Sequence, residues 1–506
     1  MEYKWTVLTV TTVGIFMSTL DASIVVVGLP TIIQDLNTSL FAGIWVITGY
    51  RLMITILLVT VGRVADIIGR VKLYNAGFAV FTAGSLFCSL APSGELLIAA
   101  RLVQGLGGAL LFVNSMAIVV DAFPTAELGT AIGINQMAIN AGTIVGYTLS
   151  GVMIGLFGWR SIFWINIPVG IFGTIWAHRR LKELYGKTTE ERFDYLGALL
   201  FSSALTIVLL ALTIGDLQSL VTRFLLITSM ALFAIFLVHE RRVAQPVLDL
   251  WLFRIRPFIA GNLSNLFNGL AFAALAFELT LYFELVKGYT DLQTGLALIP
   301  MDLTLIVIGP ISGRLSDRYG GRGLSTLGLA ITSGALLVFS TFSTDTTVIS
   351  IAAALALAGF GIGLFRSPNA SSVMASVPAD RRGIGAGVRS TILNTSSVVS
   401  IPLALALMTA VMPYDKLAIV VSATSMGSQQ ETLQLLDAIR YAFYAFAVIN
   451  ALGVIVSFLR GPRRTDTDAF SSGAGAPAAL RADVASFLVN DLCRALRAKF
   501  HLFANA

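Results

Sequence analysis

The amino-acid sequence predicts an all-α membrane protein that crosses the bilayer many times. Hydrophobic residues make up 56% of its 506 residues and charged residues only 12%, whereas soluble domains carry roughly 25% charged residues. Too few polar side chains remain to coat a water-soluble globule, which excludes a soluble enzyme and a disordered chain. The apolar residues also gather in stretches of about 20, the length that a helix needs to cross the hydrocarbon core.

Fourteen apolar stretches are predicted to be membrane-spanning helices, because a chain in lipid must satisfy its own backbone hydrogen bonds. They cover roughly 6–28, 41–62, 72–91, 96–120, 130–156, 161–178, 195–214, 222–239, 258–283, 293–313, 323–342, 348–371, 383–412 and 438–459. The first stretch has no small-residue cleavage site after it, so we expect a retained helix and not a signal peptide.

The distribution of basic residues predicts the orientation. Most Lys and Arg residues fall in the loops on one side, and the other side shows little beyond Arg160, Lys287 and Lys416. Basic loops stay in the cytoplasm, so both termini are predicted to be cytoplasmic. The inner loop 121–129 has no Lys or Arg and is the exception.

The two halves of the sequence repeat each other. The segment Gly62–Gly69 recurs as Gly313–Gly320, and parallel repeats of this kind mark one class of secondary transporters. Six spans in each half account for twelve of the fourteen stretches, so the remaining pair at 195–239 is interpreted as an insert between the halves. The predicted domains are an N-terminal six-helix bundle (1–178), a cytoplasmic linker with an inserted two-helix pair (179–256), a C-terminal six-helix bundle (257–464) and a cytoplasmic tail (465–506).

The tail after residue 464 has a different composition. A Ser/Gly/Ala/Pro-rich stretch indicates a flexible linker, and a helical period of apolar residues returns over 480–503. Two interpretations stay open for this last segment: an amphipathic helix on anionic lipid, or a poorly ordered tail.

Several motifs occur in the order typical of one transporter family. The segment Gly62-Arg-Val-Ala-Asp66-Ile-Ile-Gly69 resembles the loop between the second and third helices of the major facilitator superfamily. Three further segments resemble motifs of the fourteen-helix drug–proton antiporter branch of that superfamily. They are Leu20–Pro30 in the first helix, Arg101–Gly108 in the fourth and Gly158–Gly170 at the start of the sixth. The resemblance covers residues 5–460 and implies fourteen helices arranged six, two and six.

One position departs from that branch. Its fifth helix usually carries a Gly-Pro pair associated with antiport, and here Gly146 is followed by Tyr147. The small residues Gly142, Gly146 and Ser150 remain on one stripe, so close helix packing survives without the bend that proline imposes.

The resemblance implies a gate on the cytoplasmic side, in which the loops around Asp66 and Asp317 hold it shut through charge contacts that break on opening. The predicted gating residues are Gly62, Arg63, Asp66, Gly69 and Arg70 in the first copy and Gly313, Arg314, Asp317 and Gly320 in the second.

Ionisable side chains inside the spans are candidates for proton coupling, because a charge at mid-bilayer costs a few kcal/mol without a partner or a wet cavity. The acids are Asp21, Glu278, Glu284 and Asp302, and the cations are Arg51, Arg101, Arg366 and Arg389. Asp302, Glu278 and Asp21 are predicted in that order to carry the proton, and the resemblance implies a coupling or gating role for Arg101. The alternative for each is a structural ion pair or hydrogen bond.

Candidate substrate-binding residues come from the same helices. They are Gln104, Met137, Tyr147, Phe277, Met301 and Phe365, and the alternative for most aromatic and Met side chains is packing or contact with lipid. The sequence contains no Gly-rich nucleotide loop and no Cys/His metal motif. We therefore expect no cofactor, no metal and no enzymatic activity.

The predicted function is export of drug-like amphipathic molecules, lipophilic cations or neutral compounds, in exchange for protons by alternating access. A multi-pass location in the cell membrane, contacts with lipids, a monomeric state and no nucleic-acid partner are expected. Two alternatives stay open: a uniporter or symporter of a metabolite, lipid or siderophore, and a non-transporting sensor or scaffold that acts through the tail.

Overall fold

The computed structural model is all-helical over the residues that it describes, which are 2–124, 127–183, 194–214, 219–243, 248–378, 381–422 and 429–460. In this part of the chain, fourteen helical segments are long and apolar enough to cross a membrane. The predicted fold class is thereby confirmed. The whole tail 465–506, with its proposed amphipathic segment, lies outside the described residues.

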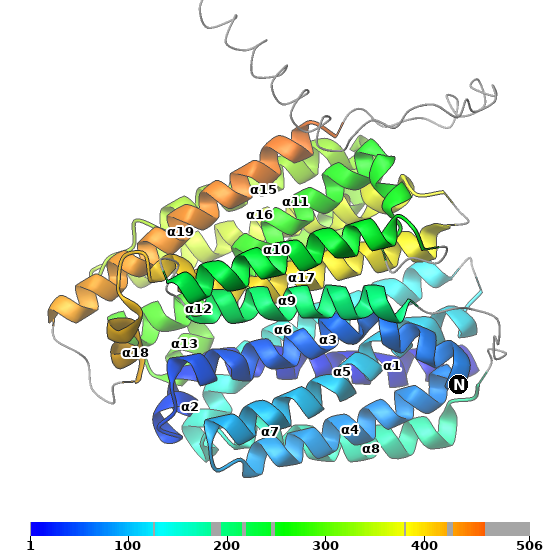
Figure 1. Ribbon diagram of the computed structural model, residues 1–506, viewed down its shortest axis with the longest axis horizontal. Helices are drawn as coiled ribbons and strands as arrows, with labels where there is room; N and C mark the ends of the chain where they lie inside the picture. The colour runs from blue at the N-terminus through cyan, green and yellow to red at the C-terminus, as the bar shows by residue number, and fades with distance from the viewer. Residues whose placement is uncertain are drawn as a thin grey trace, which may run out of the picture. The chain divides into compact units, whose positions relative to one another are not determined.

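Figure 1 shows the helices in order along the chain. The first part contains α1 (Tyr3–Val27), α2 (Leu29–Asp35), α3 (Leu40–Ile68), α4 (Arg70–Leu90), α5 (Gly94–Ala122), α6 (Leu128–Phe157), α7 (Ser161–Trp164) and α8 (Asn166–Arg180), followed by α9 (Tyr195–Ile214) and α10 (Leu220–Glu240). The second part contains η1 (Leu250–Arg254), α11 (Arg256–Phe272), α12 (Leu275–Leu281), η2 (Tyr282–Val286), α13 (Asp291–Ala297), α14 (Ile299–Tyr319), α15 (Gly321–Phe339), α16 (Val348–Ala375), α17 (Arg382–Met408), α18 (Tyr414–Ser422) and α19 (Gln429–Phe458).

Three spans are interrupted where the apolar pattern predicts continuous helices. The predicted span 161–178 divides into α7 and α8 at Ile165. The predicted span 258–283 is built from α11, α12 and the π-helical turn η2, with a break after Phe272. The predicted span 293–313 starts as α13 and restarts as α14, where Pro300 occupies the first turn. Proline suits that position because its missing N–H would have no helical partner there.

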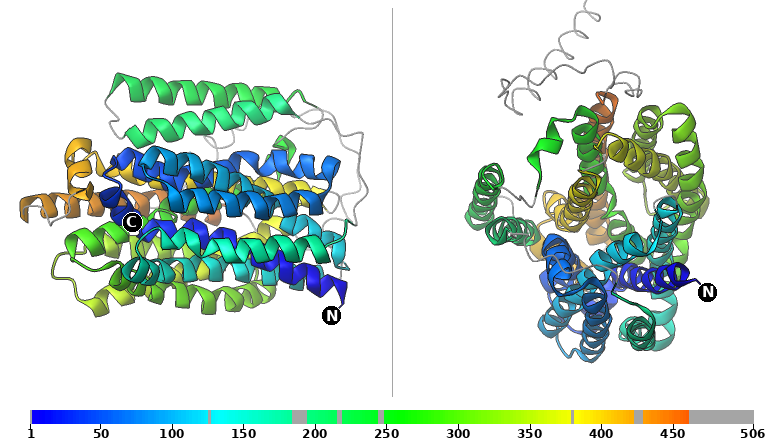
Figure 2. Two further views of the ribbon diagram at one scale, coloured as in Figure 1. Left: turned by 90° about the horizontal axis from the view of Figure 1, so that it is seen from below. Right: turned by 90° about the vertical axis from the view of Figure 1, so that its right-hand side faces the viewer.

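The same helices pack together in both halves. In the first half α5 packs against α3 and α4, and α1 against α6; in the second half α16 packs against α14 and α15, and α11 against α17. Glycine permits the closest approach: a Cβ on Gly107 of α5 would lie 2.3 Å from the Phe81 backbone nitrogen of α4. The pair α9 and α10 packs on α3 and α17 at the edge of the bundle (Figure 2). The domain boundaries themselves stay a prediction.

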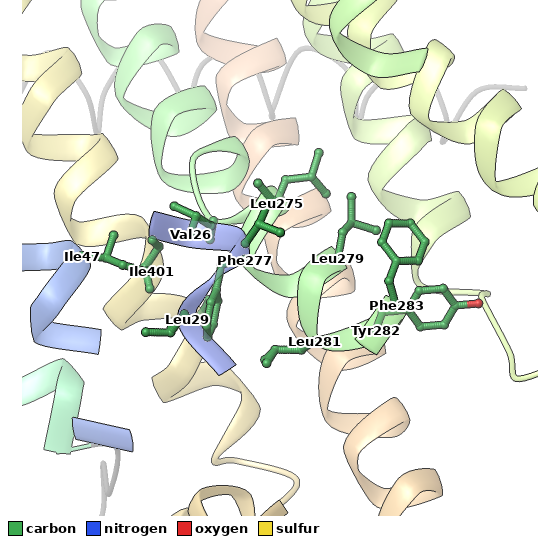
Figure 3. Packing of buried hydrophobic residues seen from close by; sticks show 14 of the residues in the cluster. Val26, Leu29, Ile47, Leu275, Phe277, Leu279, Leu281, Tyr282, Phe283 and Ile401 are labelled. Atoms are coloured by element: carbon green, nitrogen blue, oxygen red, sulfur yellow. The ribbon is translucent and has the colours of Figure 1, made fainter. Parts of the chain in front are cut away.

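The apolar core indicates which side of the bundle is closed. One cluster contains residues of both halves (Figure 3). Among them are Val26 at the end of α1, Leu29 of α2, Phe277 of α12 and Ile401 of α17. Two further clusters are separate, one within residues 7–181 and one within 252–388. With the predicted orientation, the halves are packed together on the extracellular side and have separate cores on the cytoplasmic side.

A polar contact joins the halves at the closed side. Thr31 of α2 donates to Oδ1 of Asp291, at the start of α13, over 3.1 Å. A Cβ on Gly151 of α6 would lie 2.4 Å from the Asp291 carbonyl oxygen. Backbone therefore meets backbone where the two halves are in contact at this side.

Candidate functional site

The first candidate group is an ion pair buried inside the first half. Arg101 Nη1 lies 2.5 Å from Asp21 Oδ2, and both side chains have no solvent exposure. Gln104 accepts from the same Nη1 over 2.6 Å and donates to Asp21 Oδ1 over 2.8 Å. The spacing of Arg101 and Gln104, one helical turn apart, brings both to the carboxylate of α1.

Further donors and acceptors complete this network. Asn166 of α8 donates to Asp21 Oδ1 over 2.7 Å, and Arg101 Nε donates to the Val46 carbonyl over 2.9 Å. The Tyr50 ring centre lies 4.2 Å from the guanidinium carbon. A buried ion pair tolerates desolvation only with such additional hydrogen bonds. In this conformation the network connects α1, α3, α5 and α8 and fixes their positions.

The second candidate group lies between the halves, and we call it the central cluster: Arg51, Tyr147, Asp302, Arg366 and Arg389. Tyr147 of α6 hydrogen-bonds with Arg51 of α3 and interacts electrostatically with Asp302 of α14 and Arg366 of α16. Asp302 and Arg366 attract each other, and Arg389 of α17 is close enough to Arg366 for repulsion. Asp302 is 3% exposed.

The members of the central cluster lie deep within their helices. At 1.5 Å per residue, Asp302 and Tyr147 are each about 15 Å from the extracellular ends of their spans. Arg366 and Arg389 are about 14 Å and about 10 Å from the cytoplasmic ends of α16 and α17. The cluster therefore extends from the middle of the membrane toward the side where the two halves have separate cores.

Glu278 lies apart from both groups. Its side chain has no solvent exposure, and neither carboxylate oxygen has a hydrogen-bond partner among the described residues. Its neighbours along α12, Phe277 and Leu279, belong to the shared apolar core. The structure thus brings Glu278 to the closed side, away from the arginines with which an ion pair was considered.

The first copy of the predicted gate contains a strained turn. Gly69, between α3 and α4, has φ +119°, and a Cβ there would lie 2.6 Å from Glu183 Oε2. Glu183 accepts from the backbone N–H groups of Arg70 and Val71 over 3.0 and 3.1 Å. Arg70 also pairs with Asp121 over 2.7 Å. Glycine is required at Gly69, and the negative charge of Glu183 caps the start of α4.

The second copy repeats the turn with fewer contacts. Gly320 has φ +84°, and a Cβ there would meet no atom within 4 Å. Gly62 and Gly313 lie within α3 and α14, so the segment Gly62–Gly69, which resembles a loop in sequence, is helical as far as Ile68. Arg314 is exposed. The side chains of Arg63, Asp66 and Asp317 lie outside the described residues, so their gating role stays a prediction.

The candidate substrate-binding residues separate into three environments. Gln104 belongs to the Asp21 network and Tyr147 to the central cluster. Phe277, Met301 and Phe365 are buried with at most 3% exposure. Met137 is 59% exposed and lines an apolar groove of about 450 Å³ between α1 and α6. Tyr147 is itself 7% exposed and belongs to the shared apolar core, so Met137 is the one of these six whose side chain is exposed in this conformation.

Two contacts of the site are not predicted by the sequence. Asn166 contacts Asp21 across the bundle, although only its place at the start of the sixth span marked it. Glu183 follows α8 in an ordinary basic loop, and nothing in its local sequence indicates that it caps α4. Both contacts join segments that are more than 100 residues apart, which residue spacing cannot show.

Comparisons with known proteins agree with the helical architecture. The profile of the Major Facilitator Superfamily matches residues 11–402. The riboflavin transporter RibZ of Clostridioides difficile (strain 630) is 34% identical over 396 residues, which cover 78% of this chain and 86% of that protein. The multidrug resistance protein Stp of Mycobacterium tuberculosis (strain CDC 1551 / Oshkosh) is 34% identical over 384 residues, 75% of this chain and 71% of that protein.

A solved structure shares the fold. A bacterial homolog of the human lysosomal transporter Spinster, in an inward-facing and unoccupied conformation, superposes with a TM-score of 0.67. It is 16% identical and the match covers 91% of this chain and 97% of that one. At this identity the likeness concerns the fold alone.

Proposed function

Because the chain belongs to the major facilitator superfamily, we propose that it carries amphipathic small molecules across the cell membrane by alternating access, with protons coupled at Asp302. One observation carries the proposal: a carboxyl group in the middle of the membrane lies between the halves, next to Arg366 and Tyr147. A group in this place is exposed to opposite sides of the membrane in turn when two bundles rock about a central site.

Export in exchange for protons is the first form, and the relative named as a multidrug resistance protein supports its drug-like substrate but does not bear on the proton. Exchange requires that substrate and proton exclude each other from the cluster. A substrate that donates hydrogen bonds or positive charge to the Asp302 carboxylate satisfies this condition, because it competes with the proton for one group. Differential affinity of the two states then drives the cycle.

Co-transport of substrate and proton is the second form, and the charge of the central cluster favours it. The cluster contains three guanidinium groups and one acid, so protonation of Asp302 makes it more positive. A negatively charged substrate then binds more tightly together with the proton. RibZ, a relative of similar identity, is named as a riboflavin transporter and not as a resistance protein, so substrates other than drugs stay open for this chain.

Transport into inside-out membrane vesicles tests the proposal. A panel of fluorescent amphipathic compounds is added, a pH gradient of either sign is imposed, and accumulation is followed. We expect gradient-driven movement of at least one compound by the wild type, lost in Asp302→Asn and kept in Asp415→Asn, an exposed acid of α18. Equal movement by Asp302→Asn and the wild type would contradict coupling at Asp302.

The gate has its own test. Asp66→Ala should insert and fold normally and yet abolish movement of the compound, since the charge contacts that close the cytoplasmic side would be missing. Normal transport by this variant would exclude the gating role of the Gly62–Gly69 segment.

Removal of the tail tests the alternative of a sensor or scaffold. A chain that ends at residue 464 should keep most of its transport, and loss of activity would favour the tail as the functional part.

A further inference from the structure

The cations of the central cluster outnumber its acids. Among the described residues, neither Arg51, Arg366 nor Arg389 forms an ion pair, in contrast to Arg101 with Asp21. Asp302 is the one carboxylate with which Arg366 interacts. The cluster therefore keeps a net positive charge whether Asp302 is ionised or neutral.

These cations lie at membrane depth without being fully enclosed by protein. Arg366 is exposed, and Arg51 and Arg389 are half-buried, although all three lie well inside membrane-spanning helices. A charged side chain at such depth faces the bundle interior or a water-filled space, because the bilayer core does not solvate it. By this argument the three side chains face the interior of the bundle and not lipid.

Their donors are only partly used. Arg51 donates to the Ala22 carbonyl over a long 3.5 Å and hydrogen-bonds with Tyr147. The buried Nε of Arg389 has no partner in the described part of the chain. The guanidinium of Arg366 lies 5.9 Å from the ring centre of Phe272, which adds an apolar surface beside the charge. Unused N–H groups and an aromatic face together suit an amphipathic molecule that carries an oxyanion.

We propose that Arg51, Arg366 and Arg389 bind an anionic group of the transported molecule, a carboxylate or another oxyanion on a partly apolar scaffold. Guanidinium groups match such oxyanions, since their planar fork donates two parallel hydrogen bonds. A lipophilic cation, the substrate expected from sequence, would meet three like charges here. The proposal rests on the proposed transport function, but not on the direction in which protons move.

Asp302 regulates the binding of the anion through its charge. Its carboxylate and the substrate anion compete for the guanidinium of Arg366, so the two negative charges disfavour each other. Neutral Asp302 leaves Arg366 free for the substrate, and proton and anion therefore bind together at this cluster. Exchange for a proton would then require another acid, for which Asp21 and Glu278 remain candidates.

Equilibrium binding to the purified full chain in detergent tests the charge preference. Three probes share one ring system: 2-naphthoate, its neutral carboxamide and 2-naphthylmethylammonium. We expect 2-naphthoate to bind the wild type at least tenfold more tightly than the other two. Arg366→Gln and Arg389→Gln should each lose tenfold or more of the 2-naphthoate affinity, while Asp302→Asn should gain severalfold.

Matched variants separate charge from folding. Arg366→Lys keeps the cation and should retain part of the 2-naphthoate affinity. Arg180→Gln, at an exposed position at the end of α8, should change nothing. Binding of 2-naphthoate no tighter than that of the carboxamide, including no binding of either, would overturn the proposal. So would weaker binding of 2-naphthoate in Asp302→Asn. Because no gradient is used, this result is independent of whether transport is coupled to protons.

Discussion

Removing the negative charge of Asp21 should destabilise the first half strongly. Asp21→Asn preserves the shape of the side chain but leaves the Arg101 guanidinium without a counter-charge, at a place with no solvent exposure. Loss of one partner of a buried ion pair costs about 3–5 kcal/mol. Three helices besides α1 contribute to this network, so the cost should appear as opening of the bundle and not as a local adjustment.

The chain contains its own probe for this opening. Cys88 is buried, and its Sγ lies 3.5 Å from Gln104 Oε1, inside the network. In a Cys493→Ser background it is the one remaining thiol, and its labelling by a maleimide reports exposure. Since about 1.4 kcal/mol corresponds to a factor of ten, Asp21→Asn should label at least about 100 times faster than the parent.

A second charge removal provides the control. Arg101→Met in the Asp21→Asn background leaves no unpaired charge and should recover at least about 1 kcal/mol of the loss, within the range measured for residues in direct contact. Labelling of Asp21→Asn at the parental rate would refute the reasoning. A double variant that opens more easily than either single variant would refute it too.

The remaining predictions concern packing and turns, each measured by thermal unfolding of the purified protein. Gly107→Ala should destabilise the protein by about 1–3 kcal/mol, because the added Cβ would overlap the Phe81 backbone. Gly155→Ala has open space around the added Cβ and should be neutral or stabilising. Equal effects of the two substitutions would contradict the packing. Gly69→Ala should cost more than Gly320→Ala, since both impose a strained φ but only the first meets Glu183; the reverse order would be inconsistent with this. Trp159 and Arg160 donate to Asp35 and hold its pKa below the usual value. The contact should therefore stabilise the protein at neutral pH and weaken only as the pH falls through that lowered pKa. If Asp35→Asn ceases to destabilise the protein already above the usual pKa, this account is contradicted.

Most of the fold follows from composition and length of the apolar stretches. Among the described residues, fourteen helical segments are long and apolar enough to span, because an apolar stretch of about 20 residues suffices to cross the bilayer. Several segments extend beyond the predicted bounds, such as Gln429–Phe458 against 438–459. The breaks are less predictable. Pro300 signals the restart of α14, but the interruption after Phe272 has no Gly or Pro beside it that would signal it.

The candidate site was predictable in its members more than in its contacts. Intramembrane charges mark Asp21, Arg101, Asp302 and Arg366 from sequence, and helical spacing indicates that Arg101 and Gln104 share a face. Which acid meets which cation depends on how distant helices pack. Sequence left Glu278 open as a cavity residue or an ion-pair partner, and the structure instead surrounds it with the apolar core.

Substrate-dependent proton movement tests coupling at Asp302 most directly. The purified protein is reconstituted in liposomes that contain a pH-sensitive dye, a proton gradient is imposed, and a compound moved in the vesicle assay is added. We predict proton movement that depends on the compound, vanishes in Asp302→Asn and persists in Asp415→Asn, with its sign distinguishing exchange from co-transport. Movement of the compound without proton flux, or unchanged proton flux in Asp302→Asn, would contradict the account.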